Sequence, residues 1–134
     1  MNKKFTSYTG RAGEHRVLSE LLLRGYNPAL RAVDNGVDIV PEDGITLQVK
    51  TVSHQTRSDG AYVVALGNTS YRKGNKIKTK GNLAADFLVV WLVDINQFYI
   101  IPSGFIGKRV SITLNYNKSQ FDQFKNNWQT LGRG

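Results

Sequence analysis

The chain has 134 residues, a formal net charge of +8 and no cysteine. This length fits one domain with a single core. The lack of cysteine excludes disulfides, thiolate zinc sites and a cysteine nucleophile, and two histidines are too few for a histidine-rich metal site. The excess of positive charge favours a polyanionic partner, which is a nucleic acid, an anionic membrane surface or an acidic protein.

The N-terminal residues MNKKFTSY carry positive charge, but no apolar run follows them, so they do not resemble a signal peptide. No stretch approaches the roughly 20 apolar residues that are needed to cross a bilayer. We therefore expect a cytoplasmic protein that does not enter a membrane.

Apolar residues at helical spacing, from Val17 to Leu22, predict a first helix over residues 11–24 that ends at Gly25. Extended stretches are predicted at 29–33, 37–40, 45–52, 61–66, 87–93, 98–101 and 110–114. The run at 87–93 is almost continuously apolar, which is typical of a central strand covered on both faces. A polar loop is expected over 67–82, and a closing helix over 119–128 with Ser119 as its N-cap.

This order of elements predicts one domain over residues 1–134. A helix, several strands and a closing helix indicate the α/β or α+β class, built around a mixed sheet. No internal repeat, low-complexity linker or change in composition divides the chain. The sequence Pro41-Glu42-Asp43-Gly44 is a strong turn signal, so the strands on its two sides are expected to form a hairpin.

Glu14 lies on the apolar side of the predicted first helix. It stands three residues before Val17, four before Leu18 and seven before Leu21, and in a helix this spacing brings it onto their face. A buried carboxylate without a partner is costly. Glu14 is therefore expected either to lie at the rim, where the helix dipole favours it, or to join a charged site.

Polar residues also interrupt the two strands of the predicted hairpin. Asp38 lies in a short apolar strand, although aspartate is depleted in strands. In the next strand, alternation puts Gln48 and Lys50 on one face, away from Leu47 and Val49. Each feature taken alone also fits a strand with a solvent-facing polar residue.

The length of the hairpin turn decides whether these residues meet. A three-residue loop over 42–44, with its glycine in the left-handed conformation, places Asp38 directly opposite Gln48, with Lys50 as a diagonal neighbour. A two-residue loop would move Asp38 to the other face. If the loop has three residues and the first helix packs over that end of the sheet, Glu14 joins the same cluster.

Such a cluster of oxygens and one amine has a definite chemistry. Carboxylate and amide oxygens suit Mg²⁺ or Mn²⁺, which take few protein ligands and keep several waters. The metal lowers the pKa of a bound water and neutralises charge that develops on a phosphate. Lys50 is then placed to orient that water or help activate it, and to stabilise the phosphoryl transition state. The cluster therefore predicts phosphodiester hydrolysis.

The same residues resemble the PD-(D/E)XK nuclease superfamily. The resemblance rests on Glu14, on Asp38 in GVDIV and on LQVKT over 47–51. With the opening GRAGEHRVLSELLLRGY, the spacing is most similar to the archaeal Holliday-junction resolvase branch and to small phage and intron-encoded nucleases. It implies a restriction-endonuclease-like fold, in which helices flank a mixed central sheet. It also implies a Mg²⁺- or Mn²⁺-dependent endodeoxyribonuclease that forms a homodimer.

The resemblance implies a role for each residue of the cluster. Asp38 would be the central metal ligand, Gln48 and Glu14 would complete the metal site, and Lys50 would be the catalytic lysine. Gln48 stands where the family usually has Glu or Asp, and this loss of a charge either weakens metal binding or marks an inactive copy. Asp34 is an alternative acid, but Asp38 is preferred because its strand pairs directly with the lysine strand.

The segment YRKGNKIKTK over 71–80 is the densest basic part of the chain. Its cations suit contacts with phosphates, so we predict that it binds nucleic acid. The predicted surface also extends to Arg57, which follows the lysine strand. Its residues are Arg57, Arg72, Lys73, Lys76, Lys78 and Lys80. The alternative is an ordinary solvated loop.

Three functions stay open at this point. The first is a Mg²⁺-dependent endonuclease that acts on DNA, including branched or otherwise structured DNA. The second is a nucleic-acid-binding module of the same fold without cleavage, which Gln48 favours. The third is an unrelated basic α/β domain that binds protein or RNA and carries the motif by chance.

Overall fold

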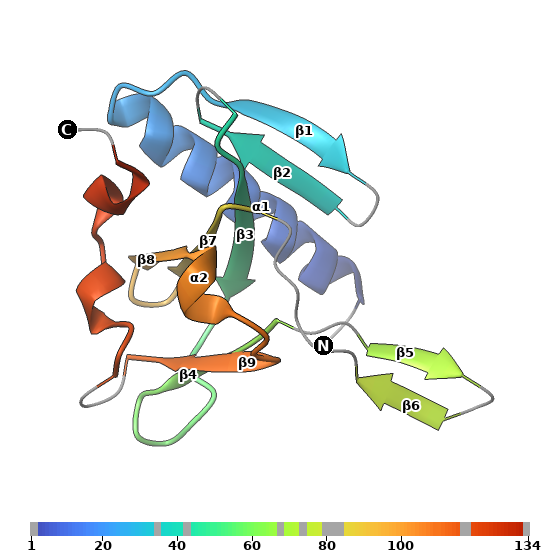
Figure 1. Cartoon of the computed structure of the whole chain (residues 1–134). Helices are drawn as coiled ribbons and strands as arrows, with labels where there is room; N and C mark the ends of the chain where they lie inside the picture. Colours follow the sequence, from blue (N-terminus) through green and yellow to red (C-terminus); the bar gives the residue numbers. More distant parts are fainter. Residues whose placement is uncertain are drawn as a thin grey trace.

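A five-stranded mixed sheet forms the centre of the protein (Figure 1). The computed structural model describes residues 3–33, 36–41, 44–66, 69–72, 75–78, 85–115 and 119–132. Its elements are α1 (Lys3–Leu23), β1 (Ala29–Val33), β2 (Gly36–Val40), β3 (Leu47–Val52), β4 (Tyr62–Ala65), β5 (Thr69–Arg72), β6 (Asn75–Lys78), β7 (Phe87–Leu92), β8 (Gln97–Pro102), α2 (Ser103–Ile106), β9 (Ser111–Leu114) and the 3-10 turns η1 (Asp122–Phe124) and η2 (Trp128–Leu131). The order in the sheet is β1-β2-β3-β7-β8, with β3 and β7 parallel and the other neighbours antiparallel. The predicted class, a helix and strands around a mixed sheet, is confirmed.

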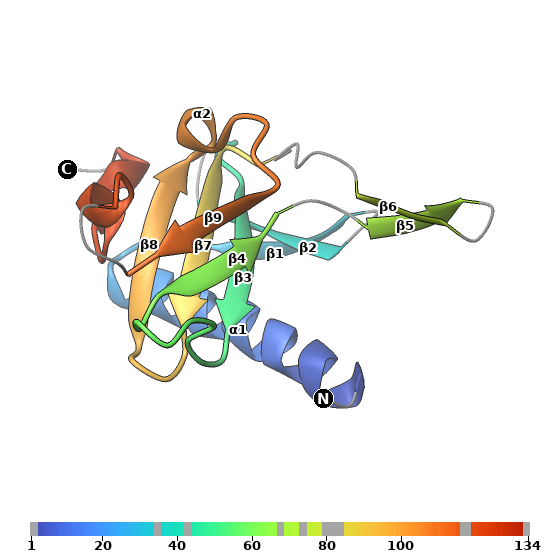
Figure 2. The ribbon, with the colours of Figure 1, turned by 90° about the horizontal axis from the view of Figure 1, so that it is seen from below.

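Apolar clusters cover both sides of this sheet. On one side α1 contributes Val17 and Leu21, which pack with Ile39, Leu47 and Ile100 and other residues of the same cluster. On the other side β4 and β9 pair as a second small sheet that crosses β3 and β7 (Figure 2). Strand β7 is therefore covered on both faces, as its apolar run predicts.

Helix α1 is longer than predicted, because it begins at Lys3 and not near residue 11. Its N-terminal part extends beyond the sheet (Figure 2), where helical spacing of apolar residues is not needed. The helix ends as predicted at Gly25, which has a φ of 89°. The Tyr26 amide donates to the Leu21 carbonyl at 3.0 Å and closes the last turn. None of the helices in the described ranges is long and apolar enough to cross a membrane.

The predicted closing helix over 119–128 is wrong, because two short 3-10 turns, η1 and η2, take its place. Ser119 still accepts a hydrogen bond from the Phe121 amide at 3.2 Å. Between the turns, Asn126 has a φ of 55°. Its backbone amide donates to the Phe98 carbonyl at 2.6 Å, and its side-chain oxygen accepts from the Phe98 amide at 2.9 Å. These bonds cover the outer edge of β8 and replace the helical hydrogen bonds.

The polar loop predicted over 67–82 contains a β-hairpin, so this prediction is wrong in part. Strands β5 and β6 pair with each other in the register Thr69↔Lys78 to Arg72↔Asn75. Both views show this hairpin projecting away from the central sheet. A projecting ribbon has no face to bury, so its sequence lacks the apolar alternation on which strand prediction depends.

Candidate active site

The hairpin formed by β2 and β3 has the register that the turn predicts. Asp38 pairs with Gln48, and Ile39 with Leu47. Gly44 has a φ of 82°, the left-handed conformation expected at the end of a three-residue loop. The other two loop residues, 42 and 43, lie outside the described residues. Gln48 and Lys50, two residues apart in β3, therefore lie on one side of the sheet, and the backbone of Asp38 lies directly beside Gln48.

This side is the one that β4 and β9 cover. The register partners of Gln48 and Lys50 in β7 are Leu88 and Val90, which belong to the cluster on the β4–β9 side. Leu47 instead packs in the cluster under α1. Gln48 and Lys50 are both half-buried, so water does not fully screen a ligand bound next to them.

Glu14 approaches from the other side of the sheet, since α1 packs there. The edge of β3 provides a route between the two sides. Strand β2 pairs with β3 only at Gln48 and Leu47, and β1 and β2 then turn away from β3 (Figure 2). Glu14 is half-buried and follows Gly13, the residue that packs on Thr51 at this part of β3. The structure thus places Gly13, the residue before the helix acid, against the strand that carries Lys50.

Gly13 is a residue whose importance the sequence prediction missed. A Cβ atom built on it would overlap the Thr51 Oγ1 atom and would lie 3.0 Å from the Thr51 Cβ atom. Only glycine therefore allows α1 to approach β3 so closely. The one available signal was a glycine inside a helix next to an acid, since an isolated helical glycine often has a packing reason.

The structure describes the side chains of two charged residues of this region, Glu14 and Lys50. The ion pairs that it describes include Arg16–Glu20, Arg24–Glu20 and Arg57–Asp59. Glu14 and Lys50 take part in none of them. Burial raises the pKa of the Glu14 carboxyl, while the charges of His15 and Arg11 lower it by a smaller amount. A carboxylate that is partly desolvated and has no salt bridge is suited to receive a cation.

Comparison with known proteins identifies the family and the fold of the chain. A family model described as PD-(D/E)XK endonuclease matches residues 4–130. The chain belongs to this family. A solved bacterial homing endonuclease, I-Ssp6803I, is similar with a TM-score of 0.77 and 21% sequence identity, covering 94% of this chain and 92% of that chain. This likeness confirms the restriction-endonuclease-like fold. No curated protein matches the chain, and the Holliday-junction resolvase branch stays a prediction.

The metal site of this PD-(D/E)XK nuclease domain stays a prediction. Within the described ranges, no three His, Cys, Asp or Glu side chains gather as metal ligands. The predicted set contains two carboxylates and the amide of Gln48, and only the backbone of Asp38 is described. Asp34, the alternative acid, lies outside the described residues. The donor types still fit Mg²⁺ or Mn²⁺, which prefer oxygen ligands.

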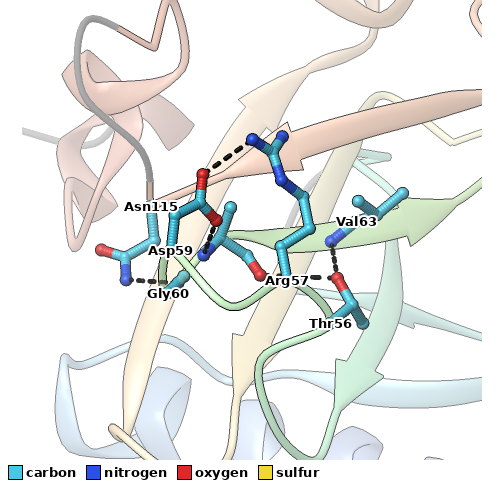
Figure 3. Close-up of polar contacts among 7 residues, drawn as sticks. Thr56, Arg57, Asp59, Gly60, Val63 and Asn115 are labelled. Atoms are coloured by element: carbon cyan, nitrogen blue, oxygen red, sulfur yellow. Dashed lines mark hydrogen bonds and ion pairs between the residues drawn. The ribbon is translucent and has the colours of Figure 1, made fainter.

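Arg57, one of the predicted nucleic-acid contacts, belongs to a compact loop between β3 and β4 (Figure 3). Its Nη2 atom donates to the Asp59 carboxylate at 2.7 Å. The same loop is held by a hydrogen bond from the Val63 amide to Thr56 Oγ1 at 2.7 Å. The loop and the β5–β6 hairpin extend from opposite ends of β4 (Figures 1 and 2). The structure therefore does not join Arg57 to the other predicted contacts.

Three of the remaining predicted contacts belong to the β5–β6 hairpin of the PD-(D/E)XK domain. Arg72 lies in β5, and Lys76 and Lys78 lie in β6. Lys73 and Lys80 lie outside the described residues. The cations thus follow a two-stranded ribbon and not a loop, and their contact with nucleic acid stays a prediction.

Proposed function

We propose that this nuclease domain is a Mg²⁺-dependent endonuclease that hydrolyses DNA phosphodiester bonds, with Mn²⁺ able to replace Mg²⁺. The observation that carries the proposal is the pairing of Asp38 with Gln48. This register gives the strand acid, the amide and the amine of Lys50 a common side of the sheet. Glu14 is the second acid of the proposed site, and it reaches the others around the open edge of β3.

The proposed metal ligands are Asp38, Gln48 and Glu14. A bound Mg²⁺ supplies a water of lowered pKa and neutralises charge on the phosphate. Asp38 supplies the central carboxylate, and the amide oxygen of Gln48 completes the site without adding charge. Because Gln48 replaces an acid usual in the family, we expect Gln48→Glu to bind the metal more tightly.

Lys50 is the cation of the proposed site. Its proposed role is to donate a hydrogen bond from the ammonium group to the attacking water or to a phosphate oxygen. Negative charge increases on these atoms in the transition state. A half-buried amine has a stronger effect there than a fully solvated one. The loss of Lys50 should therefore reduce the rate of cleavage more than it reduces the affinity for DNA.

DNA is the proposed substrate because of the charge of the chain. A net charge of +8 attracts a phosphate backbone. We propose that Arg72, Lys76 and Lys78 of the β5–β6 hairpin contact phosphates, together with Lys73 and Lys80 of the same basic segment. Branched or structured DNA is among the proposed substrates. Arg57 is expected to add less, since Asp59 offsets its charge.

A second candidate function is binding of nucleic acid without cleavage. The observation that favours it is Gln48, which leaves the site with one carboxylate fewer than the family pattern. In this case the protein binds DNA with the same salt dependence, but neither Mg²⁺ nor Mn²⁺ brings cleavage.

We also propose that the protein forms a homodimer, because two active sites are needed to cut two strands at once. Its proposed location is the cytoplasm. Sedimentation velocity should give about 30 kDa, twice the 15.0 kDa of the chain. A particle of the mass of one chain, with or without DNA, would contradict the dimer.

The test uses plasmid and branched DNA, with Mg²⁺, Mn²⁺ or EDTA, beside a Lys50→Ala variant. We expect cleavage that needs the metal and falls at least ~100-fold in the variant. Binding without cleavage would support the second function. Lys80→Ala should weaken DNA binding and lower its salt dependence but leave the metal dependence unchanged.

A further inference from the structure

The contact between Gly13 of α1 and Thr51 of β3 is unusually close for two elements of a small domain. The three heavy atoms nearest to a Cβ atom built on Gly13 all belong to the Thr51 side chain. Such a Cβ atom would overlap the Oγ1 atom of Thr51 and would lie 3.0 Å from its Cβ atom and 3.3 Å from its Cγ2 atom. Gly10, one turn earlier in the same helix, has nothing within 4 Å. A space requirement therefore applies to only one of these two glycines.

Thr51 makes this contact at a cost. Its Oγ1 atom is buried and has no hydrogen-bond partner among the described residues. A buried hydroxyl without a partner lowers stability, and a glycine inside a helix does the same. Two destabilising features in direct contact are expected where the geometry serves function and not stability.

The neighbours of the contact are the proposed site residues. Glu14 follows Gly13 in the helix, and Lys50 precedes Thr51 in the strand. We propose that the Gly13–Thr51 contact positions Glu14, by holding α1 against β3 so that its carboxylate reaches the metal ligands at the open edge of β3. Gly13 is thus a positioning residue that acts through Glu14, and this inference rests on the proposed function of Glu14.

The test is Mn²⁺ alone, titrated into the metal-free full chain and followed by electron paramagnetic resonance. Gly13→Ala should raise the Kd for Mn²⁺ by about 10-fold, as other displacements of ligand supports do. The matched control is Gly10→Ala, which should leave the Kd unchanged. In a Glu14→Gln background, Gly13→Ala should have almost no further effect, since it acts through the residue already lost.

A rescue variant separates displacement from general damage. Thr51→Ala removes the Oγ1 and Cγ2 atoms, so Gly13→Ala in that background should lose most of its effect on the Kd, compared with Thr51→Ala alone. If Gly13→Ala does not fold, Thr51→Ala alone is measured with and without Glu14→Gln, because it removes the other half of the same contact and should raise the Kd only while Glu14 is present. Cleavage of plasmid DNA is measured on the same proteins, and its loss should follow the loss of metal affinity.

Two results overturn the inference while the proposed function stands. In the first, the wild-type protein binds Mn²⁺ and cleaves DNA, and folded Gly13→Ala does both equally well. In the second, Gly13→Ala weakens Mn²⁺ binding by the same factor with Glu14 and with glutamine at that position. A wild-type protein that neither binds Mn²⁺ nor cleaves DNA overturns the proposed function, and the inference with it.

Discussion

The covered sheet and the β5–β6 hairpin are two regions of this nuclease with opposite physical properties. The covered sheet comprises β3, β7 and β8, with α1 on one side and β4 and β9 on the other. The hairpin pairs only with itself among the described strands and projects from the molecule (Figure 2). The proposed metal site needs residues held to within a fraction of an ångström, and two of its residues, Gln48 and Lys50, lie on β3 of the covered sheet. Attraction to a polyanion acts over a longer range and tolerates a projecting ribbon.

The largest loss of stability in either region should come from a cavity in the covered sheet. Leu47→Ala removes a side chain that has no exposed surface, and it should lower the free energy of unfolding by about 2–5 kcal/mol. Urea denaturation measures this change. The control is Leu30→Ala in β1, where 43% of the residue is exposed and the loss should be below about 1 kcal/mol. If the two variants lost equal free energy of unfolding, the covered sheet would not be the more tightly packed region.

A smaller loss is expected at the outer edge of β8, where Asn126 closes the covered sheet. Asn126→Ala removes the acceptor for the Phe98 amide and puts alanine at a φ of 55°. It should lower the free energy of unfolding by about 1–3 kcal/mol. Asn127→Ala is the control, because its side chain makes only an exposed bond to the Gln123 carbonyl. If both variants unfold at the same urea concentration, the edge contact has no structural role.

Tyr62 gives the covered sheet a dependence on alkaline pH. Burial, followed by the hydrogen bond to Asp94 and its charge, raises the pKa of Tyr62 to about 12 from the ordinary value of 10.0. Because the pKa of Tyr62 is higher in the folded than in the unfolded protein, its neutral phenol stabilises the folded state. This stabilisation is fully present below pH 10 and is lost between pH 10 and about 12.

Tyr62→Phe should cost about 1 kcal/mol near pH 8 because the 2.6 Å hydrogen bond is lost. Its stability should then decline less steeply than that of the wild type above pH 10. The remaining decline comes from Tyr99, whose pKa burial also raises to about 12. Parallel curves for the two proteins from pH 8 to 12 would show that Tyr62 does not titrate in this way.

The smallest effect on stability, and the largest on salt dependence, is expected in the hairpin. Lys76→Ala and Lys78→Ala should each lower the slope of log K against log salt for DNA binding by about 1. The free energy of unfolding should change by less than about 0.5 kcal/mol. Lys108→Ala is the control for loss of one charge elsewhere. If the slope falls equally in all three variants, the net charge of the protein and not the hairpin determines the salt dependence of DNA binding.

The parts of the fold that the sequence predicted are those whose signals are local. A three-residue loop ending at Gly44 was one of two loop lengths considered, and it gave the observed pairing of Asp38 with Gln48. The apolar run was enough to place β7 at the centre. Both depend on residues within a few positions of each other. The family resemblance rested on the same short stretch, and the match over residues 4–130 extends it to nearly the whole chain.

The parts that could not be predicted depend on partners distant in the sequence. The C-terminal segment has the spacing of a helix, yet Asn126 pairs with Phe98, and only the folded sheet supplies that partner. The role of Gly13 likewise depends on Thr51, which is far along the chain. The β5–β6 hairpin projects from the central sheet (Figure 2), and its sequence lacks the apolar alternation that reveals other strands.

In the proposed site, Asp38 and Gln48 hold one divalent ion beside Lys50. Anomalous diffraction from crystals soaked in MnCl₂ can locate that ion. We expect one Mn²⁺ peak at about 2.2 Å from a carboxylate oxygen of Asp38, close to the distances found for Mg²⁺, with the Gln48 amide oxygen as a second ligand. A well-ordered site without a Mn²⁺ peak, or a peak bound only by other residues, would contradict it.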